Sequence, residues 1–157
     1  MTFSHLDERG QPNMVDVSEK QISLRTAVAR SIVFLPAKVL EQLTGADIQT
    51  KKGSVFQTAI IAGIMAAKKT GDLIPLCHPL GLDNCKIAIH LNEKNEVVID
   101  CTAIIMAKTG VEMEALVGAS IAALTIYDMC KAMSHDIVIK ETKLMEKTGG
   151  KRDFKRA

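Results

Sequence analysis

The sequence predicts a ferredoxin-like α+β fold, in which two long helices cover one face of an antiparallel sheet. Two observations predict it: the expected elements follow the order strand, helix, hairpin, helix, strand, and the 157 residues suit one domain. Hydrophobic residues make up 47% of the chain and charged residues 24%, a globular balance. Because only 3% are aromatic, we expect a core of aliphatic side chains and alanine, which lets helices pack closely against a sheet.

The first half of the chain predicts one strand, one short helix and one long helix. Residues 21–35 are rich in β-branched side chains and end before Pro36, as is typical of a strand. Residues 37–43 follow as a short helix. Residues 54–69 carry apolar side chains at helical spacing over a broad face, so we expect this helix to lie against the sheet.

The second half predicts a hairpin, the longest helix and a closing strand. Residues 86–91 alternate apolar and polar side chains, and a polar turn separates them from an apolar stretch at 97–107. Residues 112–133 contain no proline and many alanines, which favours a long helix. Residues 137–147 are the last expected strand, and a glycine-containing turn follows them.

Residues 14–151 are expected to form the single domain. A polar N-terminal tail, 1–13, precedes it and stays mobile until an element captures it, and a basic C-terminal tail, 152–157, follows. The four cysteines form no C-x-x-C pair and the N-terminus is charged, so we expect reduced thiols in the cytoplasm. Apolar stretches far shorter than the ~20 residues of a bilayer span predict no membrane contact, and a net charge of +2 makes nucleic acid an unexpected partner.

Two lysines stand immediately before the first long helix. Lys51 and Lys52 are followed by Gly53 and Ser54, and ammonium groups beside free helix N–H donors attract phosphate. The alternative is a solvated loop in which Ser54 caps the helix. The segment is not a Walker P-loop, because its glycine and lysine spacing differs.

An apolar loop between the first long helix and the hairpin contains a Cys-His pair. Pro75 and Pro79 stiffen the loop around Cys77 and His78, so we expect the imidazole to be held in a fixed place. A nucleophilic dyad is one interpretation, but adjacent residues of an extended segment point in opposite directions. No further ligands at suitable spacing indicate a metal site, and a hydrogen-bonded histidine in a buried turn is the remaining alternative.

The longest helix has an uncharged middle and charged ends. Asp128 and Lys131 are three residues apart, where a helical ion pair contributes only ~0.2–0.5 kcal/mol. Asp128 also lies two heptads after Glu114, so we expect it near the buried side, where an ion pair calls for a ligand. Basic residues around the turn at 147–152 either close over an anion or form a solvated tail.

Together these segments resemble the molybdenum cofactor biosynthesis protein C family, MoaC. The resemblance covers about residues 14–151, and Ser54 departs from it where the family has Asp. The matching strings are residues 14–18 (MVDVS), 52–55 (KGSV), 72–80 (DLIPLCHPL), 109–116 (TGVEMEAL), 123–132 (ALTIYDMCKA) and 147–151 (KTGGK).

The resemblance implies a lyase that forms a cyclic phosphate. Its substrate would be 3′,8-cyclo-7,8-dihydroguanosine 5′-triphosphate, its products cyclic pyranopterin monophosphate and pyrophosphate. It implies a homohexamer, a trimer of dimers with active sites at subunit interfaces. No cofactor or protein-bound metal is expected, although Mg²⁺ can accompany the triphosphate. The residues implied are Lys52, Asp128 and Lys131 for catalysis, and Leu76, Cys77, His78, Glu112, Met113, Glu114 and Lys147 for substrate binding.

We assign the roles as a hypothesis. Lys52 is expected to donate and accept protons, because Lys51 and the helix N-terminus disfavour its charge. Lys131, paired with Asp128, is expected to remain charged and to act on phosphate or a developing oxyanion, with Asp128 as base or positioning group. A nucleotide-sensing module without catalysis and a purely structural assembly protein are the alternatives from other classes.

Glu114 and Asp128 are fourteen residues apart on one helix, which separates them by ~21 Å along its axis. A compact pocket is only about 7–10 Å across. We therefore predict that these two residues act in one site from different chains, with the helices packed antiparallel across a twofold axis. Small residues of the helix would serve that contact or face the chain's own sheet.

Overall fold

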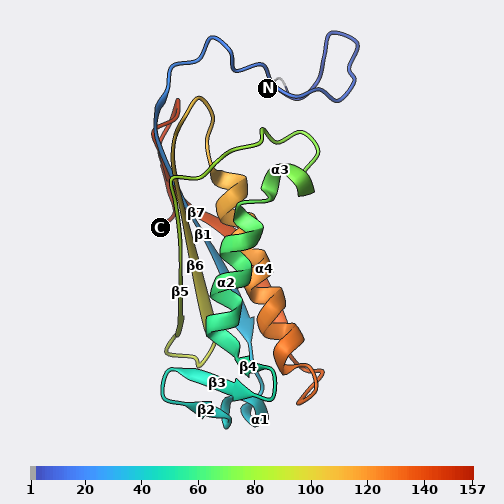
Figure 1. Ribbon diagram of the computed structural model, residues 1–157, viewed down its shortest axis with the longest axis vertical. Helices are drawn as coiled ribbons and strands as arrows, with labels where there is room; N and C mark the ends of the chain where they lie inside the picture. The colour runs from blue at the N-terminus through green and yellow to red at the C-terminus, as the bar shows by residue number, and fades with distance from the viewer. Residues whose placement is uncertain (1–2) are drawn as a thin grey trace.

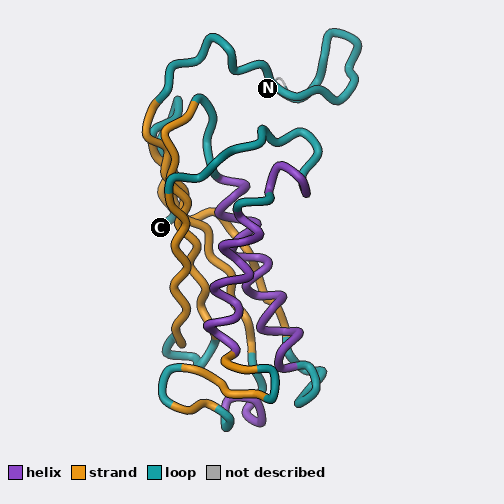
Figure 2. Tube along the Cα trace, in the orientation of Figure 1, coloured by secondary structure: helices purple, strands orange, loops and turns teal. Residues whose placement is uncertain are grey.

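The protein has two layers, a five-stranded antiparallel sheet and two long helices on one of its faces (Figures 1 and 2). The computed structural model describes residues 3–157, so the first two residues of the predicted tail lie outside the described part. The helices are α2 (Val55–Ala67) and α4 (Glu112–Cys130). The strands lie in the order β5 (Asn84–Leu91), β6 (Val97–Ala107), β1 (Ser23–Phe34), β7 (Val138–Thr148) and β8 (Phe154–Lys155). This arrangement confirms the predicted ferredoxin-like fold.

Small side chains bring the layers close together, as expected. Alternate residues of β1, such as Ala27 and Ala29, are buried in the core. Gly63 of α2 faces Gly118 of α4, and a Cβ added at Gly63 would lie 2.7 Å from the Gly118 carbonyl oxygen. A Cβ at Gly118 would lie 2.6 Å from Cys101 Sγ of β6. Larger residues at this crossing would therefore push the helices apart or off the sheet.

Helix α4 is apolar because it is a core helix. It contacts α2, β1, β6 and β7. Among the described helices it alone is long and apolar enough by composition to cross a membrane, and half of that stretch is buried inside the fold. Its alanines at 115, 119, 122 and 123 are fully buried within the chain. The small residues therefore face the chain's own core, which was one of the two uses expected for them.

The segment between the first strand and α2 differs from the prediction. Helix α1 (Ala37–Leu40) is followed by a small antiparallel sheet of β2 (Leu43–Thr44), β3 (Asp47–Thr50) and β4 (Gly53–Ser54). The short helix α3 (Thr70–Leu73) follows α2. Strands of two to four residues are too short to show an alternating pattern, so the sequence did not indicate them.

The chain after β7 turns back onto the sheet. Gly149 has φ +87°, and a Cβ there would lie 1.8 Å from the Leu24 carbonyl oxygen, so this position requires glycine. The turn directs β8 against β7, where Lys155 pairs with Glu146 in register. Part of the predicted C-terminal tail is thus an edge strand.

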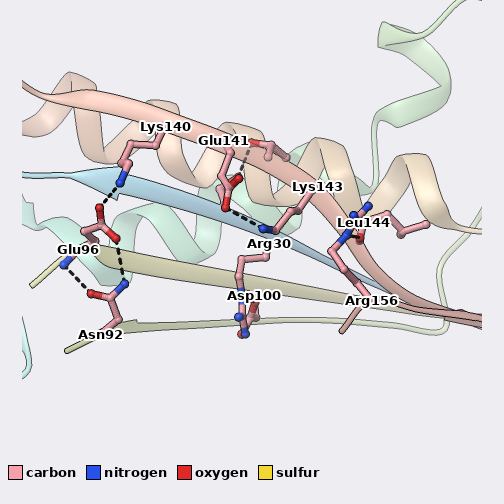
Figure 3. A network of polar contacts seen from close by, with 11 residues as sticks. Arg30, Asn92, Glu96, Asp100, Lys140, Glu141, Lys143, Leu144 and Arg156 are labelled. Atoms are coloured by element: carbon pink, nitrogen blue, oxygen red, sulfur yellow. Dashed lines mark hydrogen bonds and ion pairs between the residues drawn. The ribbon is translucent and has the colours of Figure 1, made fainter. Parts of the chain in front are cut away.

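Ion pairs link the strands on the face of the sheet away from the helices (Figure 3). Arg30 of β1 makes two hydrogen bonds with Asp100 of β6, at 2.7 and 2.8 Å. The buried Glu96, which immediately precedes β6, accepts bonds from Asn92 and from Lys140 of β7. These contacts join three neighbouring strands. The apolar core lies on the other face, between the sheet and the helices.

Candidate active site

Two adjoining cavities lie where β6 and β7 end and α4 begins. The first, ≈ 480 Å³, is lined by five cationic side chains, Lys20, Arg25, Lys147, Lys151 and Arg152. The second, ≈ 460 Å³, is lined by Leu76, Cys77, His78, Met113 and Glu114 among others. Both cavities also include Glu112, Lys147, Lys20 and Lys151. All seven residues predicted to bind substrate therefore meet at this end of the molecule.

The cationic cavity is held together by contacts with its own walls. Lys147 Nζ lies 3.0 Å from a carboxylate oxygen of Glu112. Arg25 donates to the carbonyl oxygens of Ala107 and Lys108 at 3.3 and 3.2 Å. These bonds fix two cations at the end of the sheet, where an anionic group would find several charged donors at once.

Glu114 is the most buried carboxyl group of the site, with 3% of the residue exposed. Burial is the main cause that raises its pKa, and the neighbouring charge of Glu112 adds to the effect. Such a carboxyl group holds its proton at higher pH than an exposed one. It can therefore act as a proton donor in the second cavity.

Cys77 lines the same cavity but is not activated as a nucleophile. Burial and the charge of Glu114 raise the pKa of its thiol. Because the thiolate is the reactive form, this environment keeps the sulfur unreactive. The structure supports the expectation that Cys77 and His78 do not work as a dyad.

His78 is held in place, as predicted, and its partner is a backbone carbonyl far away in sequence. Its Nε2 lies 2.6 Å from the carbonyl oxygen of Val15. A carbonyl oxygen only accepts hydrogen bonds, so Nε2 carries the hydrogen of this bond. The ring is thus anchored to the N-terminal segment as well as by the prolines of its loop.

The three predicted catalytic residues meet at the opposite end of α4. Asp128 lies 2.7 Å from Lys131 Nζ and 3.5 Å from Lys52 Nζ. The hydrogen bond and charge of Lys131, followed by the charge of Lys52, lower the pKa of Asp128. The same bond raises the pKa of Lys131. Lys131 thus stays charged, as expected, and the ammonium group of Lys52 also lies near the Asp128 carboxylate.

The expected burial of Asp128 is wrong for the isolated chain. Its side chain is 54% exposed, as is that of Lys131, and Lys52 is 62% exposed. A straight helix drifts by ∼20° per heptad, so two heptads after Glu114 the stripe has turned away from the core. The ion pairs are therefore open to solvent on the surface of this chain.

The N-terminus of α2 is capped by Asp47, not by Ser54. The Asp47 carboxylate accepts bonds from the backbone N–H groups of Phe56 at 2.7 Å and Gln57 at 3.1 Å. Ser54 Oγ bonds with the Gln49 side chain instead. Both interpretations of this segment are thus wrong in part: a carboxylate of β3 occupies two of the N–H donors proposed for phosphate, and Ser54 does not cap the helix. The sequence did not indicate Asp47 as the cap, because it does not stand at a capping position directly before the helix. The pairing of β3 with β4 brings it to the helix N-terminus.

The two groups of residues do not share a cavity. Neither cavity described above is lined by Lys52, Asp128 or Lys131. The long axis of α4 separates them, with its first turn near α3 and its last turn near β4 (Figure 1). One chain therefore presents two half-sites, a cationic cavity with a buried carboxyl group and an exposed carboxylate between two lysines.

A comparison with known protein families decides what these half-sites belong to. The family model described as "MoaC family" matches residues 14–150. The chain belongs to the MoaC family. The match includes Lys52, His78, Glu114 and Asp128, and it ends just before Lys151 and Arg152 of the cationic cavity.

Named relatives of this MoaC-family chain differ in length. It is 52% identical over 152 residues to the cyclic pyranopterin monophosphate synthase of Xanthomonas campestris pv. campestris strain B100, covering 97% of this chain and 92% of that protein. It is 56% identical over 155 residues to a molybdenum cofactor biosynthesis bifunctional protein of Synechocystis, covering 96% of this chain and 45% of that protein. It is 51% identical to molybdenum cofactor biosynthesis protein 1 of Dictyostelium discoideum, covering 95% of this chain and 26% of that protein.

Proposed function

We propose that this chain is a cyclic pyranopterin monophosphate synthase of molybdenum cofactor biosynthesis. It would be a lyase that converts 3′,8-cyclo-7,8-dihydroguanosine 5′-triphosphate into cyclic pyranopterin monophosphate and pyrophosphate. The observation that carries the proposal is the 52% identity, over 97% of the chain, to a relative with that name. We place the enzyme in the cytoplasm.

The cationic cavity is the proposed triphosphate site. Five cationic side chains line it, and Arg and Lys beside a leaving pyrophosphate stabilise the charge that develops there. We assign phosphate binding to Lys147, which Glu112 orients at 3.0 Å. We propose that any Mg²⁺ enters with the triphosphate, because the oxygen atoms of linked phosphates bind this cation.

The proton transfers are assigned to one buried carboxyl group and one exposed lysine. Opening the purine-derived ring and closing the pterin both require proton donors and acceptors. Buried Glu114, whose pKa is raised, is the proposed donor in the second cavity. Lys131 stays charged for an oxyanion or phosphate, and Asp128 positions it. Lys52, held at 3.5 Å from Asp128, remains the proposed proton carrier of the other half-site.

The proposed active site is completed by a second copy of the chain. The two half-sites of one chain are separated by fourteen residues of α4, ~21 Å. A second copy placed antiparallel would bring its Asp128 to this chain's Glu114. The buried alanines of α4 are already used inside the chain, so the contact would use other surfaces. We propose a homohexamer arranged as a trimer of dimers.

Turnover of the cyclised nucleotide tests the function. The purified protein is incubated with the substrate while pterin fluorescence and released pyrophosphate are followed together. Equal appearance of both products is expected. Binding of the nucleotide without either product would instead support a nucleotide-sensing module, and neither binding nor turnover would support a structural protein.

A further inference from the structure

The segment that precedes β1 forms a wall of the site. We call residues 15–20 the N-terminal arm. Val15, Val17 and Lys20 line the second cavity together with His78 of the apolar loop. Lys20 also lines the cationic cavity. In Figure 1 the segment leading into β1 crosses the end of the molecule where α4 begins. The shape of both cavities therefore depends on where this arm lies.

Side chains of the domain, rather than a sheet or helix, hold the arm in place. The arm precedes β1, the first strand of the sheet, and is drawn as loop in Figure 2. Two domain side chains donate to its carbonyl oxygens: His78 Nε2 to Val15 at 2.6 Å, and Lys108 Nζ to Ser18 at 2.7 Å. Side chains from two separate loops thus bind the arm at two carbonyl groups that are three residues apart.

The stretch between these two anchors is a compact turn. The Asp16 carboxylate accepts bonds from the Ser18 backbone N–H at 2.8 Å and its hydroxyl at 2.5 Å. The Lys20 N–H donates to the Val17 carbonyl at 3.0 Å. The turn therefore transmits the position of its anchors to Lys20, two residues beyond the Lys108 anchor.

Lys108 is not itself a wall of the site. It follows β6 directly and precedes Thr109 and Gly110, which line both cavities, yet it lines neither of them. Its ammonium group is bonded to the Ser18 backbone carbonyl. Because the Lys108 ammonium group bonds a backbone carbonyl outside the cavities, it is placed to hold the arm rather than to bind an anion.

We propose that Lys108 is a positioning residue. With His78 it forms a clasp that holds the arm so that Lys20 lies where the two cavities meet and binds a phosphate of the ligand. The identity of that ligand as a nucleoside triphosphate rests on the proposed function. The role proposed for the clasp requires only that the ligand is an anion with linked phosphates.

Hydrogen exchange of the arm tests the clasp without any turnover. Lys108→Met keeps the length of the side chain and removes the donor. Amides of residues 16–20 are expected to exchange at least about tenfold faster in this variant. Lys94→Met, in the hairpin turn at the other end of β6, is the matched control and is expected to exchange like the wild type. Unchanged protection of the arm in Lys108→Met would overturn the clasp.

Pyrophosphate binding tests whether Lys108 acts through Lys20. Calorimetry with inorganic pyrophosphate is expected to show about tenfold weaker binding for Lys108→Met, because the competent arm position becomes a minor state. In a Lys20→Ala background, Lys108→Met is expected to add nothing. If Lys108→Met lowers pyrophosphate affinity by the same factor with and without Lys20, the proposal is overturned. Lys108 would then bind the anion directly.

Lys108→Arg keeps a charged donor and covers the case in which the methionine variant folds poorly. It is expected to retain arm protection and pyrophosphate affinity within about twofold, with an unchanged melting temperature. Losses equal to those of the methionine variant would overturn the clasp. If the arm and pyrophosphate results hold but the cyclised nucleotide is not turned over, the clasp stands and the proposed function fails.

Discussion

The two ends of α4 hold carboxyl groups in opposite environments. Glu114 in the first turn is 3% exposed, and burial raises its pKa. Asp128 near the last turn is 54% exposed, and two lysines lower its pKa. One helix thus carries a carboxyl group that gives up its proton at higher pH than usual and another that ionises at lower pH than usual. The difference shows that burial and neighbouring charges, rather than the presence of a carboxyl group alone, set the pKa at each end of the helix.

The largest expected effect concerns the exposed end. Lys52→Ala is expected to lower turnover of the cyclised nucleotide by at least about 10²-fold, because a proton carrier contributes that much. The melting temperature should hardly change, since the lysine is 62% exposed. Lys38→Ala on α1 is the control for an exposed lysine. A melting-temperature loss like that of a core mutation would make Lys52 structural.

Subunit mixing tests whether the two ends cooperate between chains. Glu114→Ala and Asp128→Ala are each expected to be inactive. Unfolding and refolding them together should restore roughly a quarter of wild-type activity, because about half of the pairs are mixed and each has one intact site. Mixed oligomers that remain inactive would show that the two residues do not complete one site from different chains.

His78 tests the buried end through binding. His78→Ala is expected to raise KM for the cyclised nucleotide by about tenfold while changing kcat and the melting temperature less, because the ring anchors the cavity wall at 2.6 Å from Val15. His90→Ala on the exposed face of β5 is the control. Equal KM values with a lower melting temperature would restrict His78 to folding.

Replacing each of the two carboxyl groups by an amide is expected to change the pH dependence of stability in opposite directions. The raised pKa of Glu114 means that stability is lost as pH rises above its unfolded value of 4.5. Glu114→Gln is therefore expected to raise the melting temperature at pH 8 by about 2–4 °C and to leave it unchanged at pH 4.

Asp128→Asn is expected to act in the opposite direction. The lowered pKa of Asp128 contributes stability above its unfolded value of 3.8, which is lost as pH falls. The variant should lower the melting temperature at pH 8 by less than Glu114→Gln raises it, and added salt should reduce the loss. The same sign for both variants would contradict the comparison.

The smallest expected effect is at the thiol beside Glu114. Cys77→Ser is expected to keep kcat within about twofold, because burial and Glu114 keep the thiol protonated. Mass spectrometry during turnover should find no substrate attached to Cys77. A covalent adduct together with an inactive serine variant would restore the dyad that the raised pKa of the Cys77 thiol argues against.

Elements and local pairs could be predicted from the sequence because helix and strand geometry relates near neighbours. The order of the main strands and helices followed from the period of apolar residues, and Asp128 meets Lys131 since three residues make most of a helical turn. The family strings then indicated both half-sites. These properties depend on spacings within one element, which the backbone determines.

Contacts between distant segments were decided only by the tertiary structure. Lys52 reaches Asp128 from another element, Asp47 of β3 takes the helix N–H groups expected for phosphate, and His78 bonds a carbonyl 63 residues away. Spacing along the chain carries no information on such contacts, because the packing of whole elements brings their residues together.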